Sequence, residues 1–184
     1  MLTHALSSLL PPRCPGCLAS NSSGDALCPV CLPLVHALEL PLCQSCGGPL
    51  AHGEVCPECR QKDPPWRHGL SLFPYNGPIA AAIRLAKYGG HPWIFNRMGI
   101  LLAPTLRLFA PRWIIPIPPH RLGLAVRGFN PATKLALAMK RHTPEGVPRP
   151  YLLPILTRTR EGRPQAARSR GERRSLPADT FRRT

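Results

Sequence analysis

Residues 14–59 read CPGCLASNSSGDALCPVCLPLVHALELPLCQSCGGPLAHGEVCPEC and contain every cysteine of the chain. The eight cysteines form four C-x-x-C motifs, which are Cys14/Cys17, Cys28/Cys31, Cys43/Cys46 and Cys56/Cys59. Two residues between thiolates let a tight turn direct both sulfurs at one ion, and gaps of nine to eleven residues suit a hairpin that brings a second motif opposite the first. This stretch therefore predicts two structural Zn²⁺ sites, each with the four thiolate ligands that zinc prefers.

The order in which the four motifs combine is not fixed by their spacing. We expect sequential pairing, first motif with second and third with fourth, although interleaved pairing is open at these gaps. A disulfide framework or an iron–sulfur cluster would use the same residues, but four motifs with no leftover cysteine favour zinc. All-thiolate sites leave no open coordination position, so no catalytic residue is assigned here and His36 and His52 are not needed as ligands.

The N-terminal residues 1–12, MLTHALSSLLPP, are expected to form an arm or a short helix. No basic residue precedes their apolar run, which makes them a poor signal peptide. The sequence has no stretch of the ~20 apolar residues that a membrane helix needs, so no membrane insertion is expected. We therefore expect a cytoplasmic protein, in a reducing compartment where paired thiols bind metal more often than they form disulfides.

The chain is strongly basic. Its 24 Lys and Arg residues face nine acidic residues, which gives a formal net charge of +15, or roughly +11 with two zinc ions bound to eight thiolates. This charge predicts an anionic partner such as nucleic acid or a phosphorylated ligand, the alternative being an ordinary solvated basic surface. Residues 64–144 contain no Asp or Glu, so paired-carboxylate hydrolysis and a Ser-His-Asp triad lack their acid there.

Asp63-Pro64-Pro65 is expected to end the metal-binding module, which would span residues 13–63 and leave a second domain over 64–184. Apolar patterns in that domain predict helices over 79–88, 93–109 (kinked at Pro104) and 132–142, and strands over 70–75, 113–117 and 151–155. The strand over 113–117 is expected to be buried and parallel to its neighbour. Helices that alternate with short apolar strands predict an α/β domain.

Residues 113–130, WIIPIPPHRLGLAVRGFN, join the middle strand to the last of these helices. We expect a proline-rich loop that carries His120, Arg121 and Arg127 and reaches a helix N-terminus beside Gly128 and Asn130. Guanidinium groups and the positive end of a helix would converge there, as an anion site requires. The alternative is a basic loop without a ligand.

Four segments in one order resemble the ComF competence-protein family, whose members are similar to amidophosphoribosyltransferases. The segments are the cysteine motifs of 14–59, PYNGPIAAAIRLAKYGG (74–90), IIPIPPHRLGLAVRGFNPATKLA (114–136) and LTRTREGRPQAARSRGERRSLPADTF (156–181). The resemblance implies a double zinc ribbon followed by a type I phosphoribosyltransferase-like α/β domain. It also implies that a flexible region over 158–174 closes over the ligand.

The resemblance and the basic segments together name candidate phosphate- or nucleic-acid-binding residues. These are Lys87, His120, Arg121, Arg127, Gly128, Asn130, Arg158, Arg160, Gln165 and Arg173. The family continues beyond the Phe181 position into an acidic Gly/Thr-rich loop that holds phosphoribosyl pyrophosphate, whereas this sequence ends at Thr184. We therefore expect a truncated family member with an incomplete second domain.

The function expected from this resemblance is that of an accessory protein for DNA uptake in natural transformation. It would handle incoming single-stranded DNA, and the ribbon would dock a competence helicase, another uptake protein or the DNA. Trp66, Phe73 and Tyr75 are candidates for base stacking, although core packing is the alternative role for these aromatic residues. The other functions considered are a phosphoribosyltransferase that uses phosphoribosyl pyrophosphate with Mg²⁺, and a zinc-ribbon remnant without activity.

Overall fold

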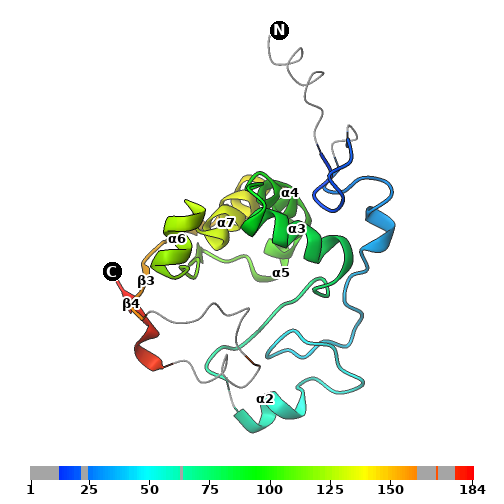
Figure 1. The fold of residues 1–184 in the computed structure, drawn as a ribbon. Coiled ribbons are helices and arrows are strands. Elements are labelled where there is room, and N and C mark those ends of the chain that lie inside the picture. The colour runs from blue at the N-terminus through cyan, green and yellow to red at the C-terminus, as the bar shows by residue number, and fades with distance from the viewer. Residues whose placement is uncertain (1–12, 22–24, 63, 161–168, 170–176) are drawn as a thin grey trace. The chain divides into compact units, whose positions relative to one another are not determined.

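The computed structural model describes residues 13–21, 25–62, 64–160, 169 and 177–184 (Figure 1). The arm or helix expected over residues 1–12 lies outside this part of the chain, as do Gln165 and Arg173. The chain divides into two compact units between Ala82 and Ile83. The domain boundaries expected from the sequence stay predictions.

Turns rather than regular elements build the first unit. Its described helices are the 3-10 turn η1 (Leu32–Leu34), α2 (Pro57–Lys62) and the beginning of α3 (Gly77–Tyr88). The strand predicted over 70–75 is wrong, because this segment is irregular and pairs with no other segment of the described chain. Leu72 accepts one hydrogen bond from the Leu38 N–H at 2.8 Å.

Cysteines supply three of the four residues in the buried cluster of the first unit. Cys14, Leu27, Cys28 and Cys31 form one buried cluster, and Val35 packs against it. So small a cluster buries too little apolar surface to hold a fold by itself. The first unit therefore depends on what its cysteines bind.

Packed helices form the second unit. The predicted helix over 93–109 is confirmed as α4 (Ile94–Leu102), the 3-10 turn η2 (Ala103–Thr105) and α5 (Leu106–Phe109), so the helix changes character where Pro104 removes an N–H donor. α7 (Pro131–Arg141) confirms the helix predicted over 132–142 and lies beside α4 (Figure 1). Gly99 of α4 lies directly against Ala138 of α7, so the two helix backbones approach closely.

Two small sheets complete the described part of the second unit, which makes it mixed α/β as predicted. β1 (Trp113–Ile114) pairs in parallel with β2 (Tyr151–Leu152). β3 (Leu156–Arg158) pairs with β4 (Phe181–Arg183) in an antiparallel hairpin, and the 3-10 turn η4 (Ala178–Thr180) leads into β4.

The strand predicted over 113–117 is parallel, but it is shorter and more exposed than expected. Pairing stops at Ile114, two residues before Pro116, which has no N–H to donate to a ladder. Trp113 is 52% exposed and Ile117 is 54% exposed. The described residues place only β2 beside this strand, so its apolar side chains are not covered as they would be inside a larger parallel sheet.

The loop predicted after Pro119 is wrong, since most of it is helix α6 (Arg121–Arg127). The Nδ1 atom of His120 accepts a hydrogen bond from the Leu122 N–H at 3.3 Å and caps the first turn. Gly128, at φ 75°, ends the helix and donates its N–H to the Leu124 carbonyl at 2.7 Å.

No helix in the described ranges is both long and apolar enough to cross a membrane.

Candidate metal centres and a basic pocket

The eight sulfurs gather into two groups of four. Within each group the sulfurs lie within 4.8 Å of one another, and the members are Cys14, Cys17, Cys28 and Cys31 in the first group and Cys43, Cys46, Cys56 and Cys59 in the second. The Cys17 and Cys28 sulfurs are 3.7 Å apart. This distance agrees with the edge of about 3.8 Å in a tetrahedron with Zn–S bonds of about 2.3 Å. The donor sets fit zinc, and their grouping is the sequential pairing rather than the interleaved one.

Backbone hydrogen bonds hold the first ligand of each group. In the first group, the N–H of Cys28 donates to the Cys14 sulfur at 3.3 Å and that of Gly16 at 3.4 Å. In the second group, the N–H of Cys56 donates to the Cys43 sulfur at 3.3 Å. Such donors stabilise a thiolate before any metal binds.

These donors lower the pKa of one thiol in each group. Burial opposes ionisation of Cys14, but N–H groups of Cys28, Cys17 and Gly16 together outweigh it and lower the pKa of Cys14 to about 7. The Cys56 N–H is the main cause that lowers the pKa of Cys43 to about 6.

The opposite shift marks the last cysteine of each group. Burial, followed by the neighbouring sulfurs, raises the pKa of Cys59 to about 12 and that of Cys31 above its usual range. Four thiolates this close repel one another unless a cation lies between them, and bound zinc would supply that charge.

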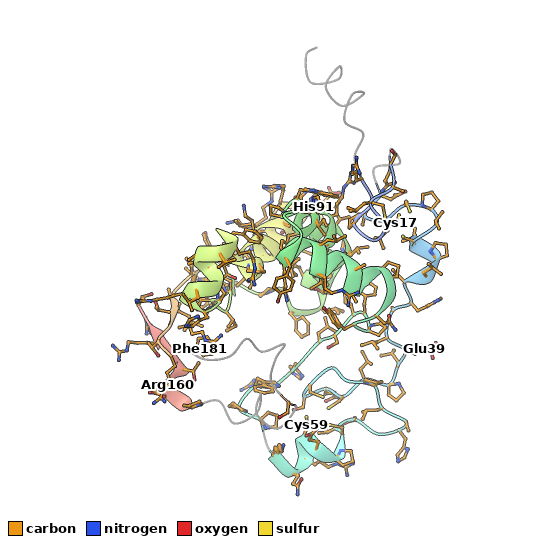
Figure 2. All side chains as sticks on the ribbon, in the orientation of Figure 1. Cys17, Glu39, Cys59, His91, Arg160 and Phe181 are labelled. Carbon is orange, nitrogen blue, oxygen red and sulfur yellow. The ribbon has the colours of Figure 1, made fainter. Side chains whose placement is uncertain are left out.

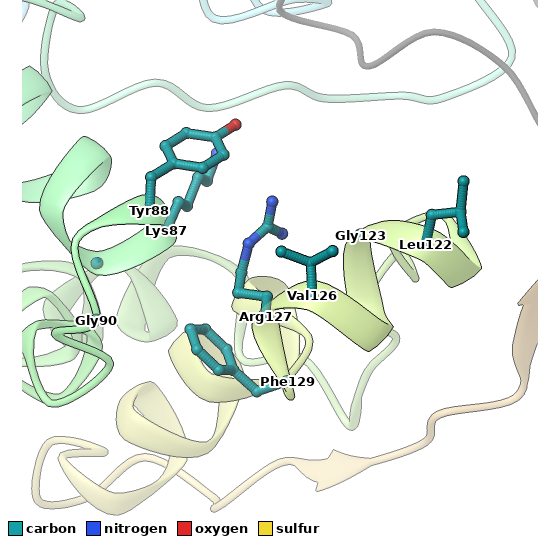
Figure 3. Close-up of a pocket in the computed structure, with 9 residues that line it drawn as sticks. Lys87, Tyr88, Gly90, Leu122, Gly123, Val126, Arg127 and Phe129 are labelled. Carbon is teal, nitrogen blue, oxygen red and sulfur yellow. The ribbon is translucent and has the colours of Figure 1, made fainter.

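The second unit contains a cavity of about 470 Å³ between the end of α3 and α6, which we call the α3–α6 pocket. Figure 3 shows Lys87 and Tyr88 on one side, facing Arg127 and Val126 of α6. The Arg127 guanidinium lies over the Tyr88 ring, 5.2 Å from its centroid. Two helices that are far apart in sequence thus place an aromatic ring and two cations together.

A second cavity of about 650 Å³, the Arg158 pocket, shares Lys87, Tyr88 and Arg127 with the first. Its lining also includes Asn130 and Arg158. The Nε atom of Arg158 is buried and makes no hydrogen bond with the described residues. The pocket therefore gathers cations from three separate elements, α3, α6 and β3.

Both pockets favour anions. Burial lowers the pKa of Lys87, and the positive charge of Arg127 lowers it further. The described lining of the two pockets includes no Asp or Glu that could relieve this repulsion. A phosphate or another anion bound there would stabilise both charges.

Other predicted binding residues have local structural roles. The side chain of Asn130 caps α7, because its Oδ1 accepts from the Ala132 N–H at 2.9 Å, and its Nδ2 donates to the Ile117 carbonyl at 3.3 Å. His120 and Gly128 begin and end α6. Asn130, His120 and Gly128 therefore have structural roles that require no bound ligand.

Two predicted arginines lie away from the α3–α6 pocket. Arg121 lines a smaller cavity of about 280 Å³ together with Asn130 and Arg158. Arg160 follows β3, where its Nε donates to a carboxylate oxygen of Asp179 at 2.8 Å, and Figure 2 shows it at the hairpin. The structure therefore brings together Lys87, Arg127 and Arg158 and leaves Arg160 in a salt bridge.

The sequence interpretation missed Tyr88 and placed base stacking on other aromatic residues. Tyr88 is 67% exposed. Its position in Lys87-Tyr88-Gly89-Gly90, at the end of a helix, was the available signal. The alternative prediction, that these aromatic residues pack in the core, is wrong for Trp66 and Tyr75, which are 54% and 63% exposed.

Residues 5–60 match the family model described as double zinc ribbon domain. The N-terminal module is a double zinc ribbon. Because the four ligands of each site in the double zinc ribbon are thiolates, the zinc they fit is structural: it would hold the module together and leave no position for a substrate.

The chain that carries this double zinc ribbon is also homologous to curated proteins. It is 26% identical over 138 residues to competence protein F of Haemophilus influenzae, and 28% identical over 123 residues to the DNA utilization protein YhgH of Escherichia coli K12. The matches cover 70% and 62% of this chain but only 59% and 54% of those relatives. The resemblance to the competence proteins is thus confirmed at modest identity.

The chain spans little more than half the length of these curated relatives. No solved structure shows significant similarity to it. The phosphoribosyltransferase-like character of the second domain stays a prediction.

Proposed function

We propose that this protein acts in DNA uptake and handles incoming single-stranded DNA. The observation that carries the proposal is the gathering of Lys87, Arg127 and Arg158 around two cavities that share lining residues and whose described lining holds no acidic residue. The relatives named for competence and DNA utilization support the same process. A formal net charge of +15 adds a long-range attraction for the phosphate backbone.

The double zinc ribbon would have a separate role in this function. Four thiolates leave a bound zinc ion no open coordination position, so the ribbon would present a surface rather than a reaction centre. We propose that this surface docks a helicase or another protein of the uptake machinery. Loss of zinc would then abolish the docking together with the fold of the ribbon.

Binding of a fluorescent oligothymidylate to the zinc-loaded protein, followed by anisotropy over a range of salt concentrations, tests the proposal. We expect binding at low salt that weakens steeply as salt rises, because condensed counterions are released from the strand. The double variant Lys87→Gln/Arg127→Gln should bind more weakly than the charge-matched control Arg107→Gln/Lys134→Gln, whose two cations lie outside both pockets. No binding by the wild-type protein at low salt would refute the proposal.

A second function is favoured by the position of the Arg158 pocket. Ile117, Pro118 and Pro119 line it just beyond the carboxyl end of β1, where α/β proteins bind phosphorylated small molecules. We propose phosphoribosyl pyrophosphate with Mg²⁺ as the alternative ligand. Isothermal titration calorimetry with phosphoribosyl pyrophosphate separates the two functions. The alternative requires saturable binding of this ligand, whereas the binding of single-stranded DNA does not.

A further inference from the structure

We infer that Tyr88 is the base-stacking residue of this protein, and that the α3–α6 pocket accepts one nucleotide of a single strand. The nucleobase would lie against the Tyr88 ring, and the adjoining phosphate would contact Lys87 and Arg127. This inference rests on the proposed binding of single-stranded DNA and adds to it the residue that recognises the base.

The first reason is the exposure of an aromatic ring beside two cations. Tyr88 is 67% exposed although it lines a pocket, so much of its ring remains available to a ligand. The Arg127 guanidinium lies over one face of the ring, 5.2 Å from its centroid. Stacking on aromatic residues combined with phosphate contacts is how proteins bind single strands without reading their sequence.

The second reason is the electrostatic setting. Lys87 and Arg127 lie close enough for the charge of Arg127 to lower the pKa of Lys87. Neither forms a salt bridge with any residue that the structure describes. A phosphate between them would replace this repulsion with two charge-assisted hydrogen bonds.

The third reason is the size of the α3–α6 pocket and the apolar side chains that line one side of it. About 470 Å³ is within the range of sites that hold small organic ligands, and Leu122, Val126 and Phe129 are the large apolar residues of its lining. Val126 is 90% exposed and Leu122 is 64% exposed. Figure 3 shows Val126 next to Arg127 on α6, where a base leaning on Tyr88 would approach it, and Leu122 toward the other end of that helix.

Another tyrosine of the second unit provides a matched control. Tyr151 is 62% exposed and has Lys140 over its ring at 5.8 Å. It lines neither of the two pockets. A general effect of losing an exposed tyrosine would therefore appear equally in Tyr151→Leu and Tyr88→Leu.

The test compares two strands of about 15 nucleotides that have the same phosphates, an oligothymidylate and an abasic strand of the same length. We expect the zinc-loaded wild-type protein to prefer the oligothymidylate by about tenfold, as one stacked base provides. Tyr88→Leu should lose this preference, whereas Tyr88→Phe and Tyr151→Leu should keep it. The salt dependence of Tyr88→Leu should equal that of wild type, because no phosphate contact is lost.

The outcomes separate the inference from the function on which it rests. Equal affinity of wild type for both strands, or an unchanged preference in Tyr88→Leu, would overturn the stacking role and leave DNA binding intact. Binding of neither strand would overturn both.

A measurement on the unaltered protein covers the case in which Tyr88→Leu fails to fold. Photo-crosslinking to a strand that contains 5-iodouracil, followed by peptide mass spectrometry, should identify the peptide with Tyr88. Crosslinks confined to Trp66, Tyr75 or Tyr151 would instead place the bases elsewhere and overturn the inference.

Discussion

The two cysteine turns over residues 13–20 and 42–49 have the same backbone geometry but different sequences. In each, the first cysteine carbonyl accepts from the N–H four residues on, at 2.8 Å for Leu18 and 2.7 Å for Gly47. Each turn is closed by an antiparallel bridge, and each places the residue after its second cysteine at positive φ, 63° for Leu18 and 70° for Gly47. The shape of the turn thus follows from its sulfurs and hydrogen bonds, since leucine adopts it as well as glycine.

The surroundings of the two zinc sites differ more than their geometry. In the first site Cys14, Cys28 and Cys31 are buried, and in the second site only Cys43 is buried. Leu27 is buried in one cluster with three ligands of the first site, and among the described residues no buried leucine is clustered with the ligands of the second. Predictions that separate the two sites therefore test whether the metal alone or the metal with its apolar cover holds each ribbon.

The largest expected effect is that of Cys14→Ser. Cys14 is a ligand, a hydrogen-bond acceptor and a core residue of the first ribbon, so we expect this site to lose its zinc and unfold, at a cost of about 10 kcal/mol. Zinc content by plasma mass spectrometry should fall from two ions per chain to one. Cys46→Ser, which removes an exposed ligand of the other site, is the control. A Cys14→Ser protein that retains both zinc ions would contradict the assignment.

Gly47→Ala should have the next largest effect. A Cβ atom at this position would lie 2.6 Å from the Ser71 nitrogen and 2.8 Å from the Leu70 carbonyl carbon, at a positive φ that alanine disfavours. We expect a loss of about 1–3 kcal/mol, measured as weaker zinc binding in competition with a calibrated chelator. Gly48→Ala is the neighbouring control, because the nearest atom to its Cβ is the Cys46 sulfur at 3.4 Å. Equal effects of the two substitutions would disprove the close approach.

Release of zinc to a chelator should proceed in two phases. The second site has one buried ligand against three in the first, so a chelator reaches its sulfurs more readily. We expect the faster phase to come from the second site and to disappear in Cys46→Ser. Release of both ions at one rate would show that the apolar cover of the first site gives no protection.

The sequence predicted the cysteine sites well because the information is local. The spacing of Cys14 and Cys17 alone fixes a turn, and sequential pairing needs only a short hairpin to bring Cys28 and Cys31 opposite. Helices α3, α4 and α7 were predicted for a related reason. Their apolar periodicity, the cap at Asn130 and the kink expected at Pro104 mark them within a few residues.

The strand predicted over 70–75 is absent, those predicted over 113–117 and 151–155 each form only in their first two residues, and α6 was not predicted, because tertiary partners decide these segments. Residues 113–117 form only two residues of strand since Tyr151 and Leu152 pair with no more of the segment. α6 starts after two prolines with a histidine cap and contains Gly123, so its local signals are weak apart from Gly128 at its end. The hairpin of β3 and β4 pairs segments more than 20 residues apart, which no local pattern reveals.

The basic pocket follows from that missed helix. Lys87 and Arg127 were both named from the sequence, but only α6 turns Arg127 toward Tyr88 and so toward Lys87. Arg158 joins them through the β3–β4 hairpin. Spacing along the chain identified the charged residues and could not identify which of them share a cavity.

The smallest expected effect concerns Leu18, which stands in the first turn where the second turn has Gly47. Leu18 adopts positive φ at a cost of about 1–2 kcal/mol, which glycine would avoid at the expense of greater freedom in the unfolded chain. Leu18→Ala removes the side chain but keeps that backbone cost, so Leu18→Gly should be more stable than Leu18→Ala by about 0.5–1 kcal/mol. Competition with a calibrated chelator would detect this as a few-fold tighter binding of zinc at the first site. If Leu18→Ala binds zinc as tightly as Leu18→Gly, the turn carries no backbone strain, and the leucine of the first ribbon and the glycine of the second are equivalent solutions.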